Sequence, residues 1–592
     1  MGEKKAEVFT IATAHLDTSW LWTLETTIKE YLPDTVKRNF AFFEKFPEYK
    51  FNFEGSYRYE LIKEYDPEAF EKIRRYVNEG RWHPCGSCYE NGDVNIPSPE
   101  AMTRNILYGN GFFEREFGVK SNDIFLPDCF GFGRALPTVA AHSGLTGFST
   151  GKLFWGSSVP IPFDTGRWTG PDGNGVWAAL MPFSYTTVFK KIEKAKRVRG
   201  KLEDNAKKGL PSYTFAYHGT GDRGGAPHKT SVRNVVTSQR NNKNADIKVY
   251  SATTKEFFDK IEFASDAEKA RFPVYDGEFL LTAHGAGSYT SRTVTKRWNR
   301  RCELLADAAE RFACAAYING FAEYPQNSFD TAWKKVIAHH FHDDITGTSF
   351  EACYKRNHND YVQALHTFSS EYTAACEALA RHLDTSFVTG IPVVVANPLQ
   401  CCDSRMQAVK VRVNSKSEYF RVFDSNGEEM PSQTKNISET EKEVTFVAKV
   451  DSCSLTVFDV RASTQCCESD TGLCIRENGI ENKYLTVTID KNGDICSIFD
   501  KRLQRELLRK PIRLGIYNDV HSFDWPSWEV KYEDLCHPPY MYAADPVIRI
   551  KEQGPALCAF EIVSTAGRST FTQTVSLDCE SEYVSVQNET DW

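Results

Sequence analysis

The sequence contains no long apolar run and no recognisable targeting segment. No stretch approaches the ~20 apolar residues that a membrane-spanning helix needs. The first residues, MGEKKAEVFTIATAHLD, lead directly into a predicted strand, and position 6 is Ala rather than the Ser or Thr of an N-myristoylation signal. We therefore expect a soluble, cytoplasmic protein with no membrane partner.

Clusters of basic residues are also missing. Lys and Arg number 71 against 79 Asp and Glu, so the net charge is -8, and such a surface repels the phosphates of nucleic acids. With 41% hydrophobic and 25% charged residues, the composition is that of a globular protein rather than a disordered scaffold or a fibrous rod. We expect no nucleic-acid partner, and association into a homo-oligomer is left open.

A disulfide framework is not indicated, although the chain has 17 cysteines. An odd number of scattered cysteines without a secretion signal is typical of free thiols in a reducing compartment. The CxxC motif from Cys85 to Cys88 has no second pair, so packing or loop cysteines are favoured there over a metal or redox site.

The 592 residues divide into three regions of different pattern. We expect a multidomain protein of α/β, all-α and all-β parts. Residues 1–280 would form an α/β barrel-like catalytic domain, 281–390 a three-helix bundle, and 391–592 a β-sandwich region that stops before it is complete.

Short apolar runs and helical patterns alternate in the first region. Val8–Ala14 and Asp123–Leu126 predict buried strands, whereas Tyr57–Tyr65, Pro67–Glu79 and Pro99–Phe117 predict amphipathic helices. This alternation is typical of a largely parallel sheet, in which active sites gather at the carboxyl ends of the strands.

The later regions have simpler patterns. Apolar residues at helical spacing predict helices at Thr293–Ala316, Thr331–Phe341 and Glu351–Leu383. The last region alternates apolar and polar residues, and its Asn-Gly pairs in Asp424–Gly427 and Asp490–Gly493 predict type I′ hairpin turns.

Polar residues follow two of the predicted strands. His15 and Asp17 are two apart and point to the same side, which suits half of a zinc site, although a buried polar pair explains them equally well. Asp128 lies between Pro127 and Gly131 after another strand, and an Asp that starts a turn is the alternative there.

Two further segments carry candidate chemistry. His339 to Thr348, HHFHDDITGT, has three His and two Asp within six residues, which favours a metal or substrate site over a solvated cluster. The glycine-rich segment His218–Pro227 lacks the Lys-Ser/Thr of a phosphate-binding loop. A mobile loop that presents Asp222 to a substrate is therefore the favoured interpretation.

Taken jointly, these motifs resemble glycoside hydrolase family 38, the zinc-dependent α-mannosidases. The order and spacing hold over about residues 8–355, and the segment around Tyr289 resembles the family's entry to its helical region. The matching motifs are HxDxxW at His15–Trp20, PDxFG at Pro127–Gly131, GDxGG at Gly221–Gly225 and HDxxxGT at His342–Thr348.

The resemblance implies one Zn²⁺ per chain, held by His15, Asp17, Asp128 and His342. It also implies that Asp128 is the nucleophile of a retaining reaction with a covalent mannosyl-enzyme, and that Asp222 is the general acid/base. Retention predicts that these two carboxyl groups lie about 5–5.5 Å apart.

The resemblance also implies substrate contacts. Trp20 would stack under the mannose at the metal, Asp343 would hydrogen-bond its hydroxyls, and Tyr289 would contact the substrate. Arg223 replaces the usual Gly beside the acid, and His284 lies one position out of register with the family's usual His, so it is assigned no role.

The predicted function is therefore a zinc-dependent retaining exo-α-mannosidase that removes terminal α-linked mannose from oligosaccharides or glycans. One alternative is another zinc-dependent glycoside hydrolase on the same site, such as one that acts on mannosyl-glycerate. The other is a shortened, non-catalytic mannoside-binding protein, because the chain ends at Trp592 in what resembles the middle of the family's β region.

Overall fold

The computed structural model describes residues 6–282, 284–400 and 405–592. No helix in these ranges is both long and apolar enough to cross a bilayer. The chain forms two compact units. Unit 1 consists of Met1–Ala306, Gln326–Ser369 and Ser522–Lys531, and unit 2 of Asp307–Pro325, Ser370–His521 and Tyr532–Trp592.

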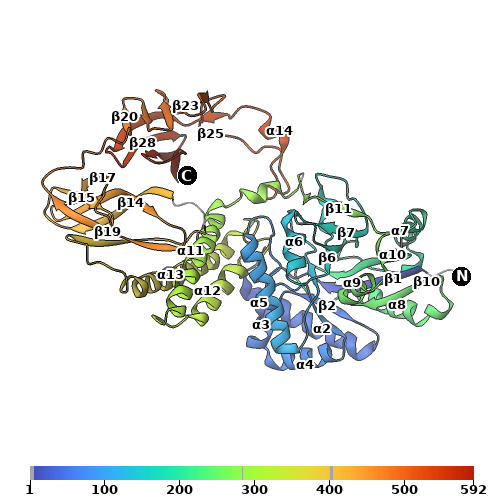
Figure 1. The fold of residues 1–592 in the computed structure, drawn as a ribbon. Helices are drawn as coiled ribbons and strands as arrows, with labels where there is room; N and C mark the ends of the chain where they lie inside the picture. Colours follow the sequence, from blue (N-terminus) through green and yellow to red (C-terminus); the bar gives the residue numbers. More distant parts are fainter. Residues whose placement is uncertain (1–5, 283, 401–404) are drawn as a thin grey trace. The chain divides into compact units, whose positions relative to one another are not determined.

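The first sheet of unit 1 is parallel and is built around β1 (Ala6–Ala14) (Figure 1). β1 is buried from Val8 onward, as its apolar sequence predicts. β1 pairs with β9 (Tyr213–Thr220), β10 (Ile247–Ala252) and β2 (Phe51–Glu54). β2 in turn pairs with β3 (Trp82–Cys85).

The second sheet of unit 1 is mixed and has the strand order β11-β7-β8-β6-β4. Its three parallel strands are β4 (Asp123–Phe125), β6 (Gly147–Ser149) and β8 (Gly175–Ala179), and its other strands are β7 (Thr165–Thr169) and β11 (Val274–Asp276).

One buried apolar cluster takes side chains from both sheets, including Ile11, Phe125, Trp177 and Phe215. The two sheets therefore enclose a common core, and the predicted barrel-like α/β domain is confirmed.

Helices alternate with these strands, as predicted. α3 (Ser56–Tyr65), α4 (Pro67–Asn78) and α5 (Pro99–Phe117) lie where helical spacing places them. The Ser98 hydroxyl accepts a hydrogen bond from the Ala101 amide at the start of α5, and Gly118 ends it in the left-handed conformation at φ 69°.

Three long helices follow the α/β region, which confirms the helical prediction. They are α11 (Thr293–Ile318), α12 (Gln326–Ala338) and α13 (Glu351–Ala380). Trp333 of α12 meets Phe368 of α13 with ring centroids 5.7 Å apart. α12 starts and ends earlier than the periodicity indicates, so the histidine-rich segment lies in the loop that follows it.

Unit 2 is rich in β-strands, as expected. One core contains Val422, Phe446 and Phe458 and lies between two antiparallel sheets. The first sheet contains β13 (Ile391–Asn397), β19 (Ser454–Ser463), β15 (Tyr419–Phe423) and β16 (Glu429–Met430), and the second β14 (Arg405–Asn414), β18 (Glu441–Val450) and β17 (Ser432–Asn436).

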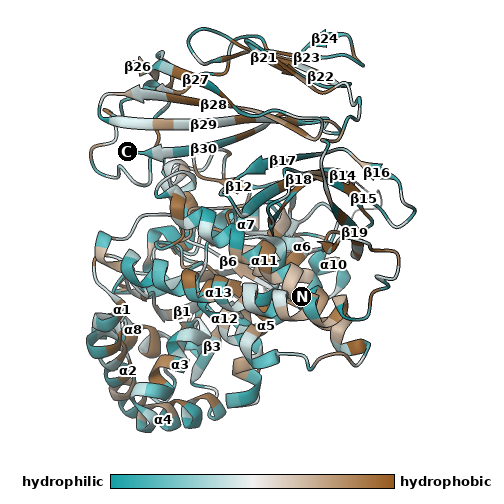
Figure 2. Ribbon diagram, turned by 90° about the vertical axis from the view of Figure 1, so that its left-hand side faces the viewer, coloured by the Kyte–Doolittle hydropathy of each residue, from teal (hydrophilic) through white to brown (hydrophobic). Residues whose placement is uncertain are grey.

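A second core of unit 2 contains Leu485, Phe560 and Val575 and again joins two antiparallel sheets (Figure 2). One sheet has β20 (Cys474–Arg476), β21 (Gly479–Glu481), β22 (Leu485–Ile489), β23 (Ile495–Asp500) and β24 (Arg505–Glu506). The other has β27 (Ala544–Glu552), β28 (Leu557–Ala566), β29 (Ser569–Asp578) and β30 (Ser585–Asp591).

The type I′ prediction for the two Asn-Gly turns is wrong. Gly427 and Gly493 have φ of 81° and 79°, but Asn426 and Asn492 are not among the described residues with positive φ. A type I′ turn needs positive φ at both central positions. In the first turn, the Asp424 carboxylate accepts from the amide of Asn426 at 2.9 Å, which stabilises the right-handed conformation there.

Candidate active site

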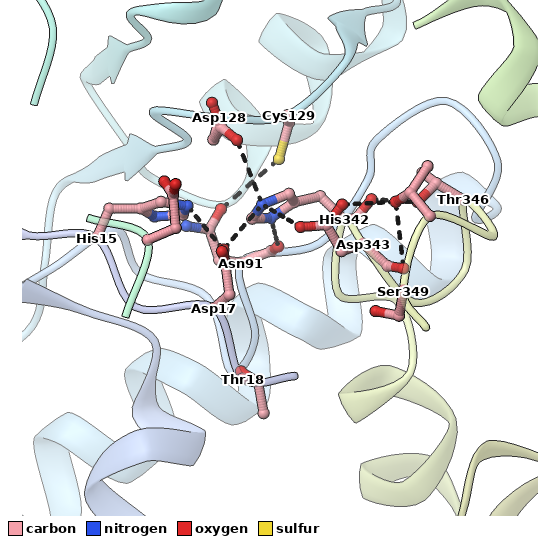
Figure 3. Close-up of polar contacts among 12 residues, drawn as sticks. His15, Asp17, Thr18, Asn91, Asp128, Cys129, His342, Asp343, Thr346 and Ser349 are labelled. Carbon is pink, nitrogen blue, oxygen red and sulfur yellow. Dashed lines mark hydrogen bonds and ion pairs between the residues drawn. The ribbon is translucent and has the colours of Figure 1, made fainter. Parts of the chain in front are cut away.

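The carboxyl ends of the parallel strands bring most of the predicted residues together. His15 and Asp17 follow β1, Asp128 follows β4, and Asp222 follows β9. Because neighbouring parallel strands end at the same edge of a sheet, His15, Asp17 and Asp222 meet at one edge of the first sheet. Asp128 comes from the second sheet, and its Oδ2 lies 4.0 Å from His342 Nε2. His342 reaches them from the loop after α12 (Figure 3).

The predicted metal ligands converge on a small buried space. His15 Nε2 lies 3.0 Å from Asp17 Oδ1, and His342 Nε2 lies 3.4 Å from that oxygen and 4.0 Å from Asp128 Oδ2. The two imidazole rings are stacked with centroids 5.2 Å apart. Ligand atoms of His15, Asp128 and His342 lie within 4.8 Å of one another, and Asp17 lies beside both histidines.

Three of these ligand atoms have no hydrogen-bond partner in the described structure, although they are buried. They are Nε2 of His15, Nε2 of His342 and Oδ1 of Asp17. An unpartnered buried polar group costs about 1–3 kcal/mol. A cation bound among these atoms would give all three a partner.

Hydrogen bonds on the far side of each imidazole fix its tautomer. His15 Nδ1 lies 2.8 Å from the carboxylate of Glu54, and His342 Nδ1 lies 3.0 Å from the carbonyl oxygen of Asn91. Both partners only accept, so each Nδ1 donates and each neutral ring offers its Nε2 lone pair to a metal. The side-chain amide of Asn91 also donates to Glu54 at 2.8 Å.

The donor set fits zinc. Two imidazole nitrogens and two carboxylates are common Zn²⁺ ligands with bonds of about 2.0–2.2 Å. Four ligands at that distance in a tetrahedron lie roughly 3.3–3.6 Å from one another. Three separations at this site, 3.0 Å, 3.4 Å and 4.0 Å, lie near this value. The chemistry does not distinguish zinc from cobalt or another borderline divalent ion.

Only part of the histidine-rich segment faces the metal site. His339 is buried between Asp344 and Asp360, at 2.6 Å and 2.9 Å. His340 instead hydrogen-bonds the side chain of Asn299 at 2.8 Å. These histidines hold the loop in place and leave His342 to act as a ligand.

Asp343, the neighbour of the ligand His342, lies beside the same space. Its Oδ2 is 3.8 Å from His342 Nε2, and its Oδ1 accepts from Thr348 at 2.5 Å. Burial raises the pKa of this carboxyl to about 7, and the field of Asp17 adds to the rise. The carboxyl can therefore accept or donate a hydrogen bond near neutral pH.

The surroundings move the pKa values of Asp128 and Asp222 in opposite directions. Burial acts to raise the pKa of Asp128, but Lys152, whose Nζ lies 2.9 Å from Oδ1, outweighs it together with the two histidines, and the net pKa is lowered. Burial raises the pKa of Asp222, and the charge of Asp17 raises it further. Two carboxyls whose pKa values are moved apart in this way suit the different roles of a nucleophile and a general acid.

Asp222 and the loop around it make several hydrogen bonds. Tyr185 Oη donates to Asp222 Oδ1 at 2.7 Å, and the main-chain oxygen of Asp222 accepts from the Asp17 amide at 2.6 Å. The Gly225 amide donates to the Thr35 hydroxyl at 2.7 Å. These contacts connect the loop to Asp17 and to the helix Leu32–Lys45, which contains Thr35. The mobility of the loop stays a prediction.

The residues predicted to bind substrate separate into two groups. Trp20 and Asp343 line the cavity that also contains Asp128 and Asp222. Tyr289 does not line this cavity, and its hydroxyl accepts from the side-chain amide of Asn95 at 2.8 Å.

Several residues that contribute to the site were not predicted. They include the histidine partners Glu54 and Asn91, and Lys152 and Tyr185 beside the two catalytic candidates. A sequence signal existed for part of this set, because Glu54 ends β2 at the same sheet edge as the ligands. The other cavity-lining residues are Trp155, His284, Trp525 and Trp528.

Family models cover most of the chain. Residues 5–278 match the glycosyl hydrolases family 38 N-terminal domain, residues 284–379 the alpha mannosidase middle domain, and residues 480–592 the glycosyl hydrolases family 38 C-terminal domain.

Similar proteins carry related names. The chain is 25% identical to alpha-mannosidase G of Dictyostelium discoideum over 100% of its own length and 56% of that protein. It is 24% identical to alpha-mannosidase 2C1 of Homo sapiens over 100% of its length and 54% of that protein. The chain thus spans little more than half the length of these relatives.

Among solved structures, an alpha-mannosidase from Enterococcus faecalis V583 has the same fold. The TM-score is 0.76 at 18% sequence identity, over 99% of this chain and 74% of that one.

Proposed function

The chain belongs to glycoside hydrolase family 38, and from this premise we propose that it is a zinc-dependent, retaining exo-α-mannosidase. Its substrates would be oligosaccharides or glycans that end in α-linked mannose. The relatives named above are α-mannosidases, but the chain spans only part of their length.

One observation carries this proposal. Asp128, whose carboxyl has a lowered pKa, and Asp222, whose carboxyl has a raised pKa, line one cavity together with the proposed metal ligand Asp17. The proposed ligands His15 and His342 lie next to Asp17, at 3.0 Å and 3.4 Å. Both carboxyls also lie close to His15, because a carboxylate oxygen of each is within 4.8 Å of a ring nitrogen of His15. A retaining glycosidase needs two such carboxyls, one ionised and one protonated.

The two carboxyls would share the reaction. Asp128 attacks C1 of the mannose while Asp222 donates its proton to the glycosidic oxygen, so the C1–O bond breaks and the leaving group departs as an alcohol. Asp222, now ionised, takes a proton from the incoming water, whose oxygen replaces Asp128 on C1. The configuration at C1 is retained because it is inverted twice.

Other side chains prepare these two groups. Lys152 holds one oxygen of Asp128 at 2.9 Å and favours its ionised form. Tyr185 orients Asp222 through the hydrogen bond of 2.7 Å.

The metal would be held by His15, Asp17, Asp128 and His342. When bound, Zn²⁺ would supply a Lewis acid for hydroxyl oxygens of the sugar. Trp20 would stack on the mannose ring, and Asp343 would hydrogen-bond its hydroxyls. We propose that Tyr289 acts indirectly through Asn95, whose side-chain amide donates a hydrogen bond to the Tyr289 hydroxyl.

The free thiols support a reducing, cytoplasmic compartment. Every cysteine within the described ranges is unpaired, including the buried Cys85 and Cys88 of the CxxC motif.

Hydrolysis of p-nitrophenyl α-mannoside with and without a chelator tests the proposal. We expect activity to be lost with the chelator and restored by Zn²⁺, with one ion per chain in metal analysis. Zinc binding without turnover of any mannoside would instead favour a binding protein.

Three variants test the assigned roles. Asp128→Ala should lose turnover by at least ~10³-fold. Asp222→Ala should lose about 10²–10⁴-fold on a mannobiose, whose leaving group needs a proton, and much less on the nitrophenyl substrate. Asp266→Ala, an exposed carboxylate outside the cavity, is the matched control. Near-normal activity of Asp128→Ala would contradict its role as nucleophile.

A further inference from the structure

Four aromatic rings line the active-site cavity but have no role in the proposed chemistry. Trp155, His284, Trp525 and Trp528, here called the aromatic wall, line the same cavity as Asp128. His284 is the centre of the wall, with ring centroids 4.9 Å, 5.6 Å and 6.3 Å from Trp155, Trp525 and Trp528. Four rings in one connected cluster form a continuous surface.

The aromatic wall lies next to the proposed catalytic groups. Lys152 Nζ lies 2.9 Å from Asp128 Oδ1 and 4.7 Å from the ring centroid of Trp155. Phe130 connects the two regions a second time, because its ring lies 5.8 Å from that of His342 and 6.3 Å from that of Trp528. A ligand at the metal would therefore be separated from the aromatic wall by about the width of one side chain.

Part of the aromatic wall comes from a distant segment of the chain. Trp525 and Trp528 belong to Ser522–Lys531, which lies inside the C-terminal family match yet is part of unit 1. The main-chain oxygen of Trp528 accepts from the amides of Gly285 and Gly287, both at 2.9 Å. These bonds fix the tryptophans beside the cavity.

Close backbone packing reinforces this attachment. A Cβ on Gly287 would lie 2.8 Å from the main chain of Glu529, so only glycine permits the approach. The Ser291 hydroxyl donates to the main-chain oxygen of Ser527 at 2.7 Å. His284 Nδ1 also lies 3.5 Å from the carboxylate of Glu529. The segment is built into the site rather than resting on it.

Trp155 is the exposed member of the wall, whereas Trp525 and Trp528 are half-buried. Trp155 is 48% exposed, whereas Trp82, Trp168 and Trp333 of the protein core are at most 1% exposed. Large aromatic side chains are costly to leave in water, and at a cavity mouth they are typical of ligand contacts. Trp155 and Trp525 are nearly perpendicular, at 87°, so they form a corner rather than a flat plate.

We propose that Trp155, Trp525 and Trp528 bind the leaving group, the sugar that is joined to the terminal mannose through the scissile oxygen. This inference rests on the proposed function, since it names the occupant of the space next to the mannose. A pyranose ring presents apolar C–H faces that pack on aromatic faces, and its edges carry hydroxyls. The corner would contact both, with the neighbouring His284 and Glu529 as polar partners.

Two substrates separate leaving-group binding from the chemistry at the metal. α-Mannosyl fluoride has a leaving group too small to reach the wall, whereas a mannobiose carries a full sugar there. For Trp155→Ala and Trp525→Ala, we expect the ratio of kcat/KM for mannobiose to that for the fluoride to fall about tenfold or more. The aromatic variants Trp155→Phe and Trp525→Phe should keep most of the ratio.

Phe523→Ala is the matched control, because Phe523 is 85% exposed, lies two residues before Trp525 and does not line the cavity. It should leave the ratio unchanged. An unchanged ratio in both tryptophan variants, or equal losses on both substrates, would overturn the inference while leaving the proposed function intact. A native enzyme that hydrolyses neither substrate would instead overturn the proposed function, and the inference with it.

Discussion

Glu54 provides a sharp test of the metal site, because it touches a ligand but not the metal. Its Oε1 accepts from His15 Nδ1 and from the Asn91 side chain, both at 2.8 Å, and the residue is 1% exposed. Glu54→Gln keeps the shape and one acceptor oxygen but removes the charge. Glu54→Ala removes both hydrogen bonds.

The structure sets the expected magnitude. A hydrogen bond to a charged group contributes about 1.5–3 kcal/mol, against about 0.5–1.5 kcal/mol for a neutral pair. In Glu54→Gln, the hydrogen bond to His15 should therefore be weaker by about 1–1.5 kcal/mol. This corresponds to a loss of about five- to tenfold in zinc affinity. The alanine variant should lose about 10–100-fold, as expected for a residue that orients a metal-bound histidine.

Competition with a fluorescent zinc chelator at fixed pH measures these affinities. Glu60→Gln is the control, because Glu60 pairs with Lys334 and Tyr89 rather than with a ligand. With saturating zinc, the Glu54 variants should recover much of their activity. If Glu54→Ala bound zinc within twofold of the native protein, the argument that Glu54 orients His15 would be refuted.

Other predictions concern stability. Arg58 and Glu90 form a fully buried ion pair at 2.8 Å, so Arg58→Met should destabilise the protein by about 3–5 kcal/mol; thermal unfolding that starts at an unchanged temperature would contradict this. A Cβ on Gly109 of α5 would lie 2.1 Å from the main-chain oxygen of Ser87, so Gly109→Ala should cost about 1–3 kcal/mol. Gly111→Ala in the same helix meets nothing within 4 Å and should be neutral or stabilising by up to about 1 kcal/mol, which differential scanning calorimetry on the two variants would show.

Local patterns predict the strands and the residues that follow them. β1 and β4 are short apolar runs, and the parallel pairing of β1 with β9 places His15, Asp17 and Asp222 at one edge. Asp128 follows β4 in the second sheet, so its approach to them depends on the packing of the two sheets. The three long helices follow from apolar spacing, since each buries one face. These predictions succeed because the responsible forces act within a few residues.

Other features depend on contacts that no local pattern reveals. Asn91 is 251 residues from His342, which it orients, and the wall pairs Trp155 with Trp525. The glycines of the Asp222 loop suggest freedom, yet Thr35 and Asn39, nearly 190 residues away, bind that loop. In the histidine-rich segment, His339 and His340 make hydrogen bonds to other side chains. Composition alone does not distinguish such supporting residues from the proposed ligand His342.

Ser522–Lys531 lies late in the chain, yet two of its residues, Trp525 and Trp528, line the active-site cavity. The segment falls within the C-terminal family match, but its backbone bonds reach Gly285, Gly287 and Ser291. Exchange of the C-terminal region between related proteins would therefore replace one wall of the cavity while leaving the metal and both carboxyls untouched. Evolution could in this way change the preferred partner sugar in one recombination event, provided that the small residues that receive the segment were kept.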